Sequence, residues 1–507
     1  MRTHLSFISP RLNYDALFFA LAGFMLVQLF AHYGGIGISP DSVVYTSTAR
    51  SIYAHTGIRD YNHMPLIDFP VLYPLFLGTV YRITGVDPLP AGPYINGALF
   101  GMLIYLCGCM MQRWKYNNRW YKIFILGCIT ISPALLEVYY MLWSETLFIF
   151  LSIVFMALLR RYCNTHSIPS LLAVGFCAST ACITRYAGVT LIGTGGLILL
   201  MDNTLPWKKK AAHIILFGFT AISLLVINLY VNFGYSHTLT GPREKGITPF
   251  SANLHYFSTV MCDWLPFMRN HYGIASLIGG ALVAGSACLI GYRWLRNKNV
   301  RSYENIATVF FFGYAAFMLL SATISRYETI NSRLLSPLYI PLLWTFTSWV
   351  PVVFKRLNRT VRVRLGVALT AGGLFFWAGE YAFSRYMYNE VRDFGIAGYT
   401  DDSWRLSPFC QYLKQHHELF KPNYSIFSNA SDALYFVTGV TGISLPHTNS
   451  PGDINDYVTN PEHYVVWFRN VDDQDLLSEQ YIRQSKHTEV VYETTDGVVY
   501  WCTGPGK

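Results

Sequence analysis

Residues 121–161 read YKIFILGCITISPALLEVYYMLWSETLFIFLSIVFMALLRR, and they decide what kind of fold this chain can adopt. They contain two apolar runs, 121–136 and 142–159, and each comes close to the roughly 20 residues needed to cross about 30 Å of hydrocarbon. Only residues 137–141 separate the runs, so the chain turns back without room for a domain between them. The stretch predicts a helical hairpin through a membrane.

Further apolar runs of this kind flank the hairpin and bring the candidate spans to eleven. They are 15–33, 93–112, 168–186, 187–201, 211–231, 273–292, 305–324, 334–354 and 365–384. Charged residues make up 13% of the 507 residues, about half of the roughly 25% found in soluble proteins. This composition excludes a disordered, collagen-like or water-soluble multidomain protein. It predicts a mainly α, polytopic membrane protein, whose first run we expect to be an uncleaved anchor because no small-residue cleavage site follows it.

Basic residues between the runs predict the orientation in the membrane. Five short loops carry them in alternation along the chain, as the positive-inside rule expects for the cytoplasmic face. The basic residues are Arg113, Lys115, Arg119 and Lys122; Arg160 and Arg161; Lys208, Lys209 and Lys210; Arg293, Arg296, Lys298 and Arg301; and Lys355, Arg356, Arg359, Arg362 and Arg364. The N-terminus is therefore predicted to be cytoplasmic, and the chain beyond about residue 385 to lie outside.

The net charge of +9 is unevenly divided along the chain. Residues 1–379 carry 29 of the 38 Lys and Arg and 12 of the 29 Asp and Glu, whereas residues 380–507 carry the remaining 9 and 17. The basic part is the membrane body, where positive charge reports orientation, and the tail is acidic. The sequence therefore excludes nucleic acid as a partner.

The predicted outer segments contain structure of their own. Residues 1–384 form the membrane body, and its first outer loop, 34–92, is expected to hold short helices at 42–55 and 75–83. Residues 385–507 are predicted to form a small α/β domain. Its expected strands are 424–428, 464–468, 489–492 and 498–502, with helices at 431–438 and 475–484 and a hairpin turn at Asp496-Gly497. A disulfide among Cys262, Cys410 and Cys502 is left open.

Ionisable residues gather at the predicted outer face, where burial near lipid is costly and often serves function. They are Asp41, Glu137, Glu145, Arg185, Arg326, Glu328 and Arg333. Taken singly, the acids are explained as helix caps or first-turn acids, and the arginines as headgroup anchors or partners of Glu145. Together they suit group transfer from a lipid phosphate, in which a carboxylate takes a hydroxyl proton and arginines hold the leaving phosphate.

Five stretches carry a resemblance to a known family: 39–57 (SPDSVVYTSTARSIYAHTG), 69–76 (FPVLYPLF), 144–148 (SETLF), 184–188 (TRYAG) and 331–339 (NSRLLSPLY). The sequence resembles the GT-C superfamily of polyprenyl-phosphate-dependent glycosyltransferases, above all bacterial relatives of protein O-mannosyltransferases and aminoarabinose transferases. The resemblance covers roughly residues 10–350. It implies a GT-C-like fold with about eleven transmembrane helices, juxtamembrane helices in the first outer loop and an outer C-terminal domain.

The resemblance also implies roles for residues. Asp41 matches the family's catalytic base and Glu145 a recurrent acid that orients substrate or binds a cation. Arg185, Arg333 and Arg326 are expected at the donor phosphate. Tyr45, Tyr73 and Tyr186, which lie within the quoted stretches, are expected to contact substrate. Ser42 follows Asp41 where some relatives have a second acid, and no Asp-x-Asp pattern is present, so a Mg²⁺ or Mn²⁺ requirement stays open.

The expected reaction moves a sugar from a polyprenyl-phosphate donor to a glycan, lipid or protein acceptor, with inversion, at the outer face of a bacterial inner membrane. Membrane lipids are the expected surroundings, and an endoplasmic reticulum membrane is the alternative location. Two other functions stay open: a polysaccharide polymerase or ligase of another membrane fold, and a transporter or flippase of lipid-linked sugars. A flippase would favour charges near the bilayer midplane and repeated halves.

Overall fold

The computed structural model describes residues 12–115, 117–241, 244–326 and 328–505. The chain divides into two compact units. The first, which we call the helical unit, contains Met1–His32, Leu66–Tyr73 and Ala91–Asn389, and the second, the sheet unit, contains Tyr33–Pro65, Pro74–Pro90 and Glu390–Lys507. Segments of the first outer loop therefore group with the C-terminal residues. The predicted division at 384/385 stays a prediction.

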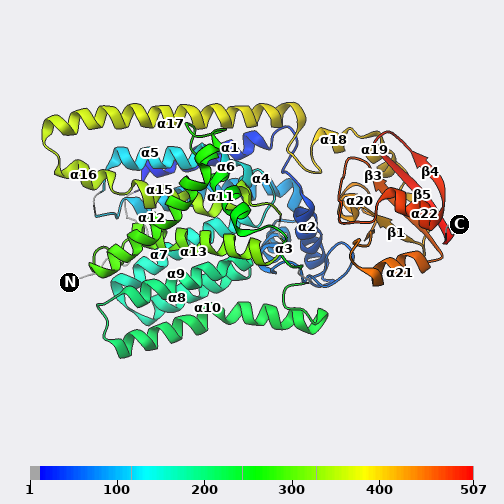
Figure 1. Cartoon of the computed structure of the whole chain (residues 1–507), viewed down its shortest axis with the longest axis horizontal. Helices are drawn as coiled ribbons and strands as arrows, with labels where there is room; N and C mark the ends of the chain where they lie inside the picture. Colours follow the sequence, from blue (N-terminus) through cyan, green and yellow to red (C-terminus); the bar gives the residue numbers. More distant parts are fainter. Residues whose placement is uncertain (1–11, 116, 242–243, 327, 506–507) are drawn as a thin grey trace. The chain divides into compact units, whose positions relative to one another are not determined.

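The helical unit is built from α-helices and a few short 3-10 helices (Figure 1). In chain order they are α1 (Tyr14–Phe30), α4 (Pro88–Met111), α5 (Arg119–Thr130), α6 (Pro133–Tyr139), α7 (Glu145–Thr165), α8 (Ile168–Cys182), η1 (Tyr186–Gly188), α9 (Val189–Met201), α10 (Trp207–Ser236), α11 (Phe250–Asp263), η2 (Tyr272–Ile274), α12 (Ala275–Leu295), α13 (Tyr303–Ile324), α14 (Ser332–Leu335), η3 (Ser336–Leu338), α15 (Tyr339–Thr347), α16 (Val350–Arg356) and α17 (Arg359–Phe394).

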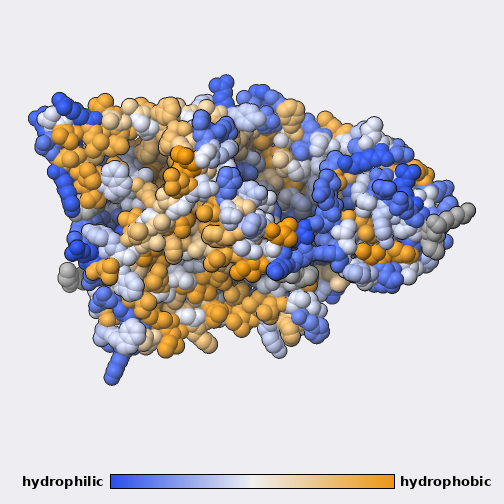
Figure 2. All heavy atoms as spheres, viewed as in Figure 1, coloured by the Kyte–Doolittle hydropathy of each residue, from blue (hydrophilic) through white to orange (hydrophobic). Residues whose placement is uncertain are grey.

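These helices confirm a polytopic membrane fold. Among the described residues, seven helical segments are long and apolar enough to cross a membrane, and the bent pair α5 and α6 adds an eighth. The helices Tyr14–Phe30, Ile168–Cys182 and Tyr186–Met201 are apolar but shorter. Each of the eleven predicted runs falls on one of these segments. Figure 2 shows apolar side chains over much of the surface of the helical unit, as lipid contact requires.

Local sequence explains where two helices break. Ser132 caps α6 by accepting a hydrogen bond from the Leu135 backbone amide at 3.3 Å, and Pro133 follows at the first helical position. The chain therefore bends by 50° between α5 and α6. Glu137, which we expected in a connecting turn, lies in α6 instead. The chain also breaks between the predicted runs 168–186 and 187–201, where η1 separates α8 from α9. Gly188 suits this break, because a Cβ there would come 2.5 Å from the Cys182 backbone nitrogen.

Four of the five basic loops are linked by contacts at one end of the helical unit. Arg119 and Lys122 both form ion pairs with Asp15 at 2.9 Å, and Arg113 of the same loop contacts Tyr303, next to the Arg301 loop. Arg160 donates to the Arg301 carbonyl, and Arg301 lies 4.0 Å from Asp202, near the start of the Lys208 loop. The loops that the positive-inside rule assigns to one side thus share one end, while the direction of the membrane stays a prediction.

The sheet unit contains a five-stranded mixed sheet in the order β2-β1-β3-β5-β4. The strands β2, β1 and β3 are parallel, whereas β5 runs antiparallel to both β3 and β4. Its elements are α2 (Pro40–Tyr53), most of α3 (Leu72–Thr84), α18 (Asp402–Arg405), α19 (Pro408–Gln415), η4 (His417–Leu419), β1 (Ser425–Ser428), α20 (Ser431–Thr438), β2 (Ile443–Ser444), α21 (Pro451–Thr459), β3 (Glu462–Phe468), α22 (Glu479–Ser485), β4 (Lys486–Glu493) and β5 (Gly497–Pro505).

Two apolar cores cover the two faces of this sheet, which explains the predicted α/β character. Phe409, Leu434 and Val466 belong to one core, and Tyr457, Val465 and Ile482 to the other. Neighbouring residues Val465 and Val466 of β3 point to opposite cores, as the alternation of a strand requires. All ten cysteines are free, including Cys262, Cys410 and Cys502, so the sheet is held by packing without a disulfide.

Candidate functional site

A buried carboxylate with two arginine partners forms the core of the candidate site in the helical unit. Glu145 is the first residue of α7 and its side chain is 1% exposed. Its Oε1 atom lies 2.8 Å from Nη1 of Arg185 and accepts a hydrogen bond from Nε of Arg333 at 2.7 Å. The sequence-based possibility that Arg185 pairs with Glu145 is therefore realised, with Arg333 added.

Each arginine is placed by a break in helical structure. Arg185 is the residue before η1, at the break that ends α8, and its Nη1 atom donates to the Ser144 hydroxyl at 2.9 Å. Arg333 lies in the short helix α14, which Asn331 caps by accepting from the Leu334 amide. The Arg333 guanidinium also lies 4.2 Å from the ring centre of Trp143, a cation–π contact that fixes its plane.

Glu145, Arg185 and Arg333 together carry one positive charge, and the carboxylate of Glu328 offsets it. The Oε1 atom of Glu328 lies 3.8 Å from Nη1 of Arg333. The two arginine side chains are 18% and 13% exposed. Guanidinium groups held in this way suit a phosphate, which takes charge-assisted hydrogen bonds from them.

The same geometry does not fit a metal ion at Glu145. A divalent cation would stand next to two guanidinium groups that already compensate the carboxylate. In the described part of the chain, no group of three or more His, Cys, Asp and Glu side chains is arranged to hold a metal. No step proposed below therefore runs through a cation.

Three other predicted residues of the helical unit are not members of the two ion pairs. Tyr73 is fully buried near Thr146 and Glu145. The Tyr186 hydroxyl accepts a hydrogen bond from Asn232 at 3.3 Å. Arg326 forms an ion pair with Glu244 at 2.6 Å. Substrate contact by the two tyrosines and phosphate contact by Arg326 stay predictions.

Asp41 and Tyr45 belong to the sheet unit, on helix α2. Ser39 caps this helix, with Ser42 reaching back to the Ser39 amide at 3.1 Å, and Pro40 occupies the first helical position. Asp41 is therefore a first-turn acid and not the cap residue. Tyr45 is 2% exposed.

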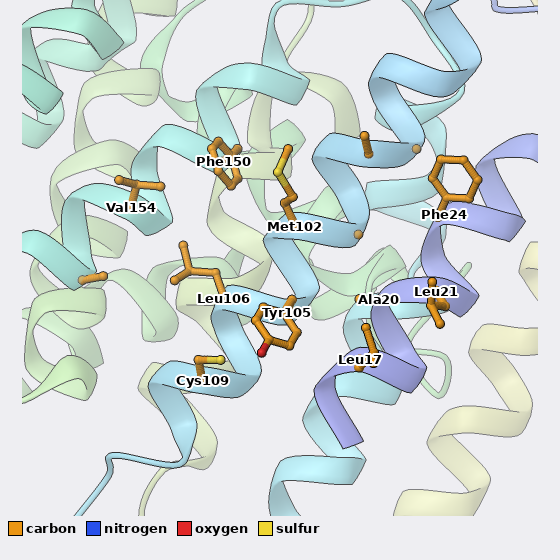
Figure 3. A pocket seen from close by; sticks show the side chains of 14 residues that line it. Leu17, Ala20, Leu21, Phe24, Met102, Tyr105, Leu106, Cys109, Phe150 and Val154 are labelled. Carbon is orange, nitrogen blue, oxygen red and sulfur yellow. The ribbon is translucent and has the colours of Figure 1, made fainter. Parts of the chain in front are cut away.

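An apolar groove runs between α1, α4 and α7 of the helical unit and has a volume of about 520 Å³ (Figure 3). Leu17, Leu21, Met102 and Phe150 are among its lining residues. Phe150 follows Glu145 by five residues on α7, which is about 7.5 Å along a helix axis. The groove therefore comes within two helical turns of the charged cluster.

A second buried ion pair, which we did not expect from the sequence, lies in the helical unit. Glu380 on α17 is fully buried, and its Oε1 atom lies 3.3 Å from Nη2 of Arg269. The signal was present, since an acid inside the apolar run 365–384 is costly in lipid. Gly379 marks the same contact, because a Cβ there would come 2.4 Å from Pro266. This pair joins α17 to the segment between α11 and α12.

Comparison with solved structures identifies the fold. The chain aligns with the crystal structure of ArnT from Cupriavidus metallidurans in the apo state with a TM-score of 0.57 and 12% identity, over 94% of this chain and 96% of that chain. For the same protein bound to undecaprenyl phosphate, the TM-score is 0.58 at 12% identity, over 96% and 97%. The chain has the ArnT fold.

A cryo-EM structure of the arabinofuranosyltransferase AftD from Mycobacteria also aligns, with a TM-score of 0.47 and 12% identity, over 97% of this chain and 42% of that chain. No protein-family model matches the sequence, and no curated protein matches it. The ArnT fold confirms the GT-C-like architecture that the five sequence stretches predicted. It covers the membrane body and the C-terminal α/β domain together, since nearly the whole of both chains aligns.

Proposed function

We propose that this protein is an integral-membrane glycosyltransferase that moves a sugar from a polyprenyl-phosphate donor to an acceptor hydroxyl or amine. The observation that carries the proposal is the buried Glu145 cluster, in which two oriented guanidinium groups lie within two helical turns of an apolar groove. A lipid phosphate needs both features, because its headgroup is anionic and its chain is apolar. The ArnT fold, found in a structure that holds undecaprenyl phosphate, supports the same donor class.

In this proposal, Arg185 and Arg333 bind the donor phosphate. Glu145 holds both guanidinium groups in place through its Oε1 atom, so the phosphate meets donors that are already oriented. Trp143 keeps the Arg333 guanidinium in one plane. The polyprenyl chain would occupy the groove beside Phe150, where the lining side chains are apolar.

The proposed reaction is a single displacement at C1 of the sugar. The acceptor oxygen or nitrogen forms a bond to C1 as the C1–O bond to the phosphate breaks, and the phosphate leaves with the bonding electron pair. Asp41 takes the proton from the acceptor as general base, a contribution typically worth about 10²–10⁴-fold in rate. Arg185 and Arg333 stabilise the charge that develops on the departing phosphate. Attack opposite the phosphate inverts the configuration at C1.

We place the reaction at the outer face of a bacterial inner membrane, with the N-terminus in the cytoplasm. The clustering of the Arg119, Arg160 and Arg301 loops at one end of the helical unit supports this orientation, because cytoplasmic loops collect positive charge. The acceptor is a glycan, lipid or protein.

The test is transfer in proteoliposomes from a panel of radiolabelled polyprenyl-phosphate sugars. The wild type is compared with Asp41→Asn, with Arg333→Lys and with the control Asp453→Asn, an exposed acid of α21. We expect donor consumption by the wild type and the control, its loss in Asp41→Asn and a raised donor KM in Arg333→Lys. Consumption unchanged in Asp41→Asn would contradict the assigned base.

If the folded protein consumes none of the donors, the proposed reaction is wrong. Two functions would then be measured on the same vesicles. Movement of intact labelled donor across the bilayer would indicate a flippase of lipid-linked sugars. Chain growth from a diphosphate-linked oligosaccharide would indicate a polysaccharide polymerase or ligase.

A further inference from the structure

Tyr399 bridges the start of α2 to helix α20 within the sheet unit. Its backbone amide donates a hydrogen bond to the Ile38 carbonyl at 2.8 Å, three residues before Asp41. Its hydroxyl donates to Oδ2 of Asp432, in the first turn of α20, at 2.7 Å. One residue of the C-terminal segment therefore fixes both the approach to α2 and a side chain of α20.

The segment that follows α2 makes a second connection to α20. The Tyr61 hydroxyl lies 3.0 Å from the Ser431 hydroxyl, and the Tyr61 ring stacks on Tyr435 with centres 5.3 Å apart. On α2 itself, Arg50 forms a bidentate pair with Asp87, with distances of 2.7 and 3.0 Å. Helix α2 is thus held at its start by Tyr399 and at its last turn by Asp87.

Helices α2 and α20 contact each other, and the Asp41 carboxylate acts on Asp432. Burial raises the pKa of Asp432, the nearby Asp41 carboxylate raises it further, and the hydrogen bond from Tyr399 acts in the opposite direction. Burial also raises the pKa of Tyr61 to about 12, with Asp432 and Asp60 adding to the effect. The carboxylate of α20 therefore faces the first turn of α2.

Resting on the base role proposed for Asp41, we infer that Tyr399 is a positioning residue: through Ile38 and Asp432 it holds the first turn of α2 in the orientation that proton transfer requires. The C-terminal α/β domain then takes part in the reaction by orienting the base, without touching the sugar. This positioning role does not depend on whether the acceptor is a glycan, a lipid or a protein.

The physical reason is the steep dependence of proton transfer on geometry. A base must lie within about 2.6–3.2 Å of the proton-bearing atom, and a misplacement of about 1 Å costs on the order of 10²-fold in rate. Asp41 lies in the first turn of α2, close to the Ile38 carbonyl that Tyr399 holds. Loss of the Tyr399–Asp432 hydrogen bond should therefore lower the rate of the chemical step while donor binding, assigned to Arg185 and Arg333, is retained.

The test uses full-length protein in proteoliposomes and the donor that the wild type consumes. Tyr399→Phe and Asp432→Ala both remove the hydrogen bond, whereas Asp432→Asn keeps an acceptor for the Tyr399 hydroxyl. The control is Tyr457→Phe, because Tyr457 is a buried tyrosine of the same unit that packs in the core on the other face of the sheet. Two quantities are measured: kcat and donor KM of transfer, and hydrogen exchange of the α2 amides.

We expect Tyr399→Phe and Asp432→Ala to lower kcat by about 10–100-fold with donor KM within about twofold of the wild type. The α2 amides of both variants should exchange faster, because their helix start is less restrained. Asp432→Asn should restore most of kcat and of the α2 protection. Tyr457→Phe should match the wild type in both measurements.

Three results would overturn the inference. If Asp41→Asn abolishes transfer while Tyr399→Phe leaves kcat unchanged, the positioning role is wrong and the proposed function stands. If Asp432→Asn lowers kcat as far as Asp432→Ala does, the charge of Asp432 is important for transfer and its hydrogen bond with Tyr399 is not. If Asp41→Asn transfers at the wild-type rate, the base assignment and the positioning role fail together.

Discussion

The two units surround their key carboxylates with opposite kinds of neighbours. In the helical unit, Glu145 is almost fully buried and meets two guanidinium groups on one oxygen atom. In the sheet unit, Asp41 lies on a helix whose facing side chains include Asp432 and Tyr399. A carboxylate that two arginines share holds those arginines in place, whereas the other carboxylate is the one proposed as the base.

The difference shows that the residue type alone does not assign the role. Both acids stand in the first turn of a helix, and both follow an apolar span in the sequence or begin one. Their neighbours come from segments far away in the chain: Arg185 and Arg333 for one, and Asp432 for the other. The predictions below test whether the two carboxylates really differ in this way.

The largest expected effect is on stability, from Glu145→Ala. Removal of this carboxylate leaves two largely buried guanidinium groups without their shared partner, and breaking a buried pair costs about 3–5 kcal/mol. Thermal unfolding of the purified protein in detergent measures the loss. Asp41→Asn should unfold at nearly the wild-type temperature. A stable Glu145→Ala protein that lacks only transfer would remove the proposed distinction between the two acids.

A pH-dependent loss of stability is expected in the sheet unit. His463 on β3 is fully buried between the rings of Phe427 and Tyr457, and burial lowers its pKa from 6.5 to about 4. As the pH falls below about 6.5, the unfolded chain takes up the proton first, so folding stability falls until the pH reaches the folded-state pKa. The loss between pH 7 and pH 4.5 is about 2–3 kcal/mol.

Hydrogen exchange of the β3 and β5 amides at the two pH values measures this loss. His463→Phe should remove most of the difference between pH 7 and pH 4.5. His487→Gln, which changes an exposed histidine of β4, should keep it. Equal pH dependence in His463→Phe and the wild type would show that other groups are responsible.

A smaller effect is expected from Glu380→Gln in the helical unit. Glu380 has one arginine partner, Arg269, which also donates to the Asp263 carbonyl and lies 4.0 Å from the centre of the Phe383 ring. Because Arg269 keeps these contacts, the substitution should cost about 1–3 kcal/mol, less than Glu145→Ala. Thermal unfolding compares the two variants directly. A larger loss in Glu380→Gln would make the α17 pair the stronger anchor.

The smallest effect is expected from Arg326→Ala. Its ion pair with Glu244 is partly exposed, with side chains 31% and 40% accessible, and such surface pairs contribute about 0–1 kcal/mol. Unfolding temperature should therefore change little. Donor KM tests the sequence-based prediction for the same residue: a rise comparable to that of Arg333→Lys would support a phosphate contact by Arg326.

Most of the fold could be predicted because lipid imposes a simple pattern on sequence. Each of the eleven runs falls on a helical segment, and the strand predicted at 424–428 agrees with β1 to within one residue. The misses have physical causes. The bend at Ser132-Pro133 depends on local capping inside an apolar run, and α21 (Pro451–Thr459) is amphipathic and polar enough to read as a loop.

The site was predictable in part. Glu145, Arg185 and Arg333 could be predicted because they cluster at the predicted outer face of the membrane. In the structure, both arginines contact one oxygen atom of Glu145. Nothing in the sequence indicated Asp432 or Tyr399, since they lie more than 350 residues after Asp41 and only the tertiary fold brings Tyr399 to Ile38. The local sequence pattern indicates which residues are costly to bury. Which residues contact one another depends on the tertiary fold.

The distribution of thiols gives this protein a natural label. Nine of its ten cysteines are buried, and Cys288 on α12 is exposed. It lies 13 residues after the start of that helix, about 20 Å along the axis, and therefore well inside an apolar span. In detergent, where water reaches the thiol and allows the reactive thiolate to form, a maleimide fluorophore should react at this one position. Quenching by lipids that carry bromine at different acyl depths would then measure the immersion of α12 without engineering a single cysteine.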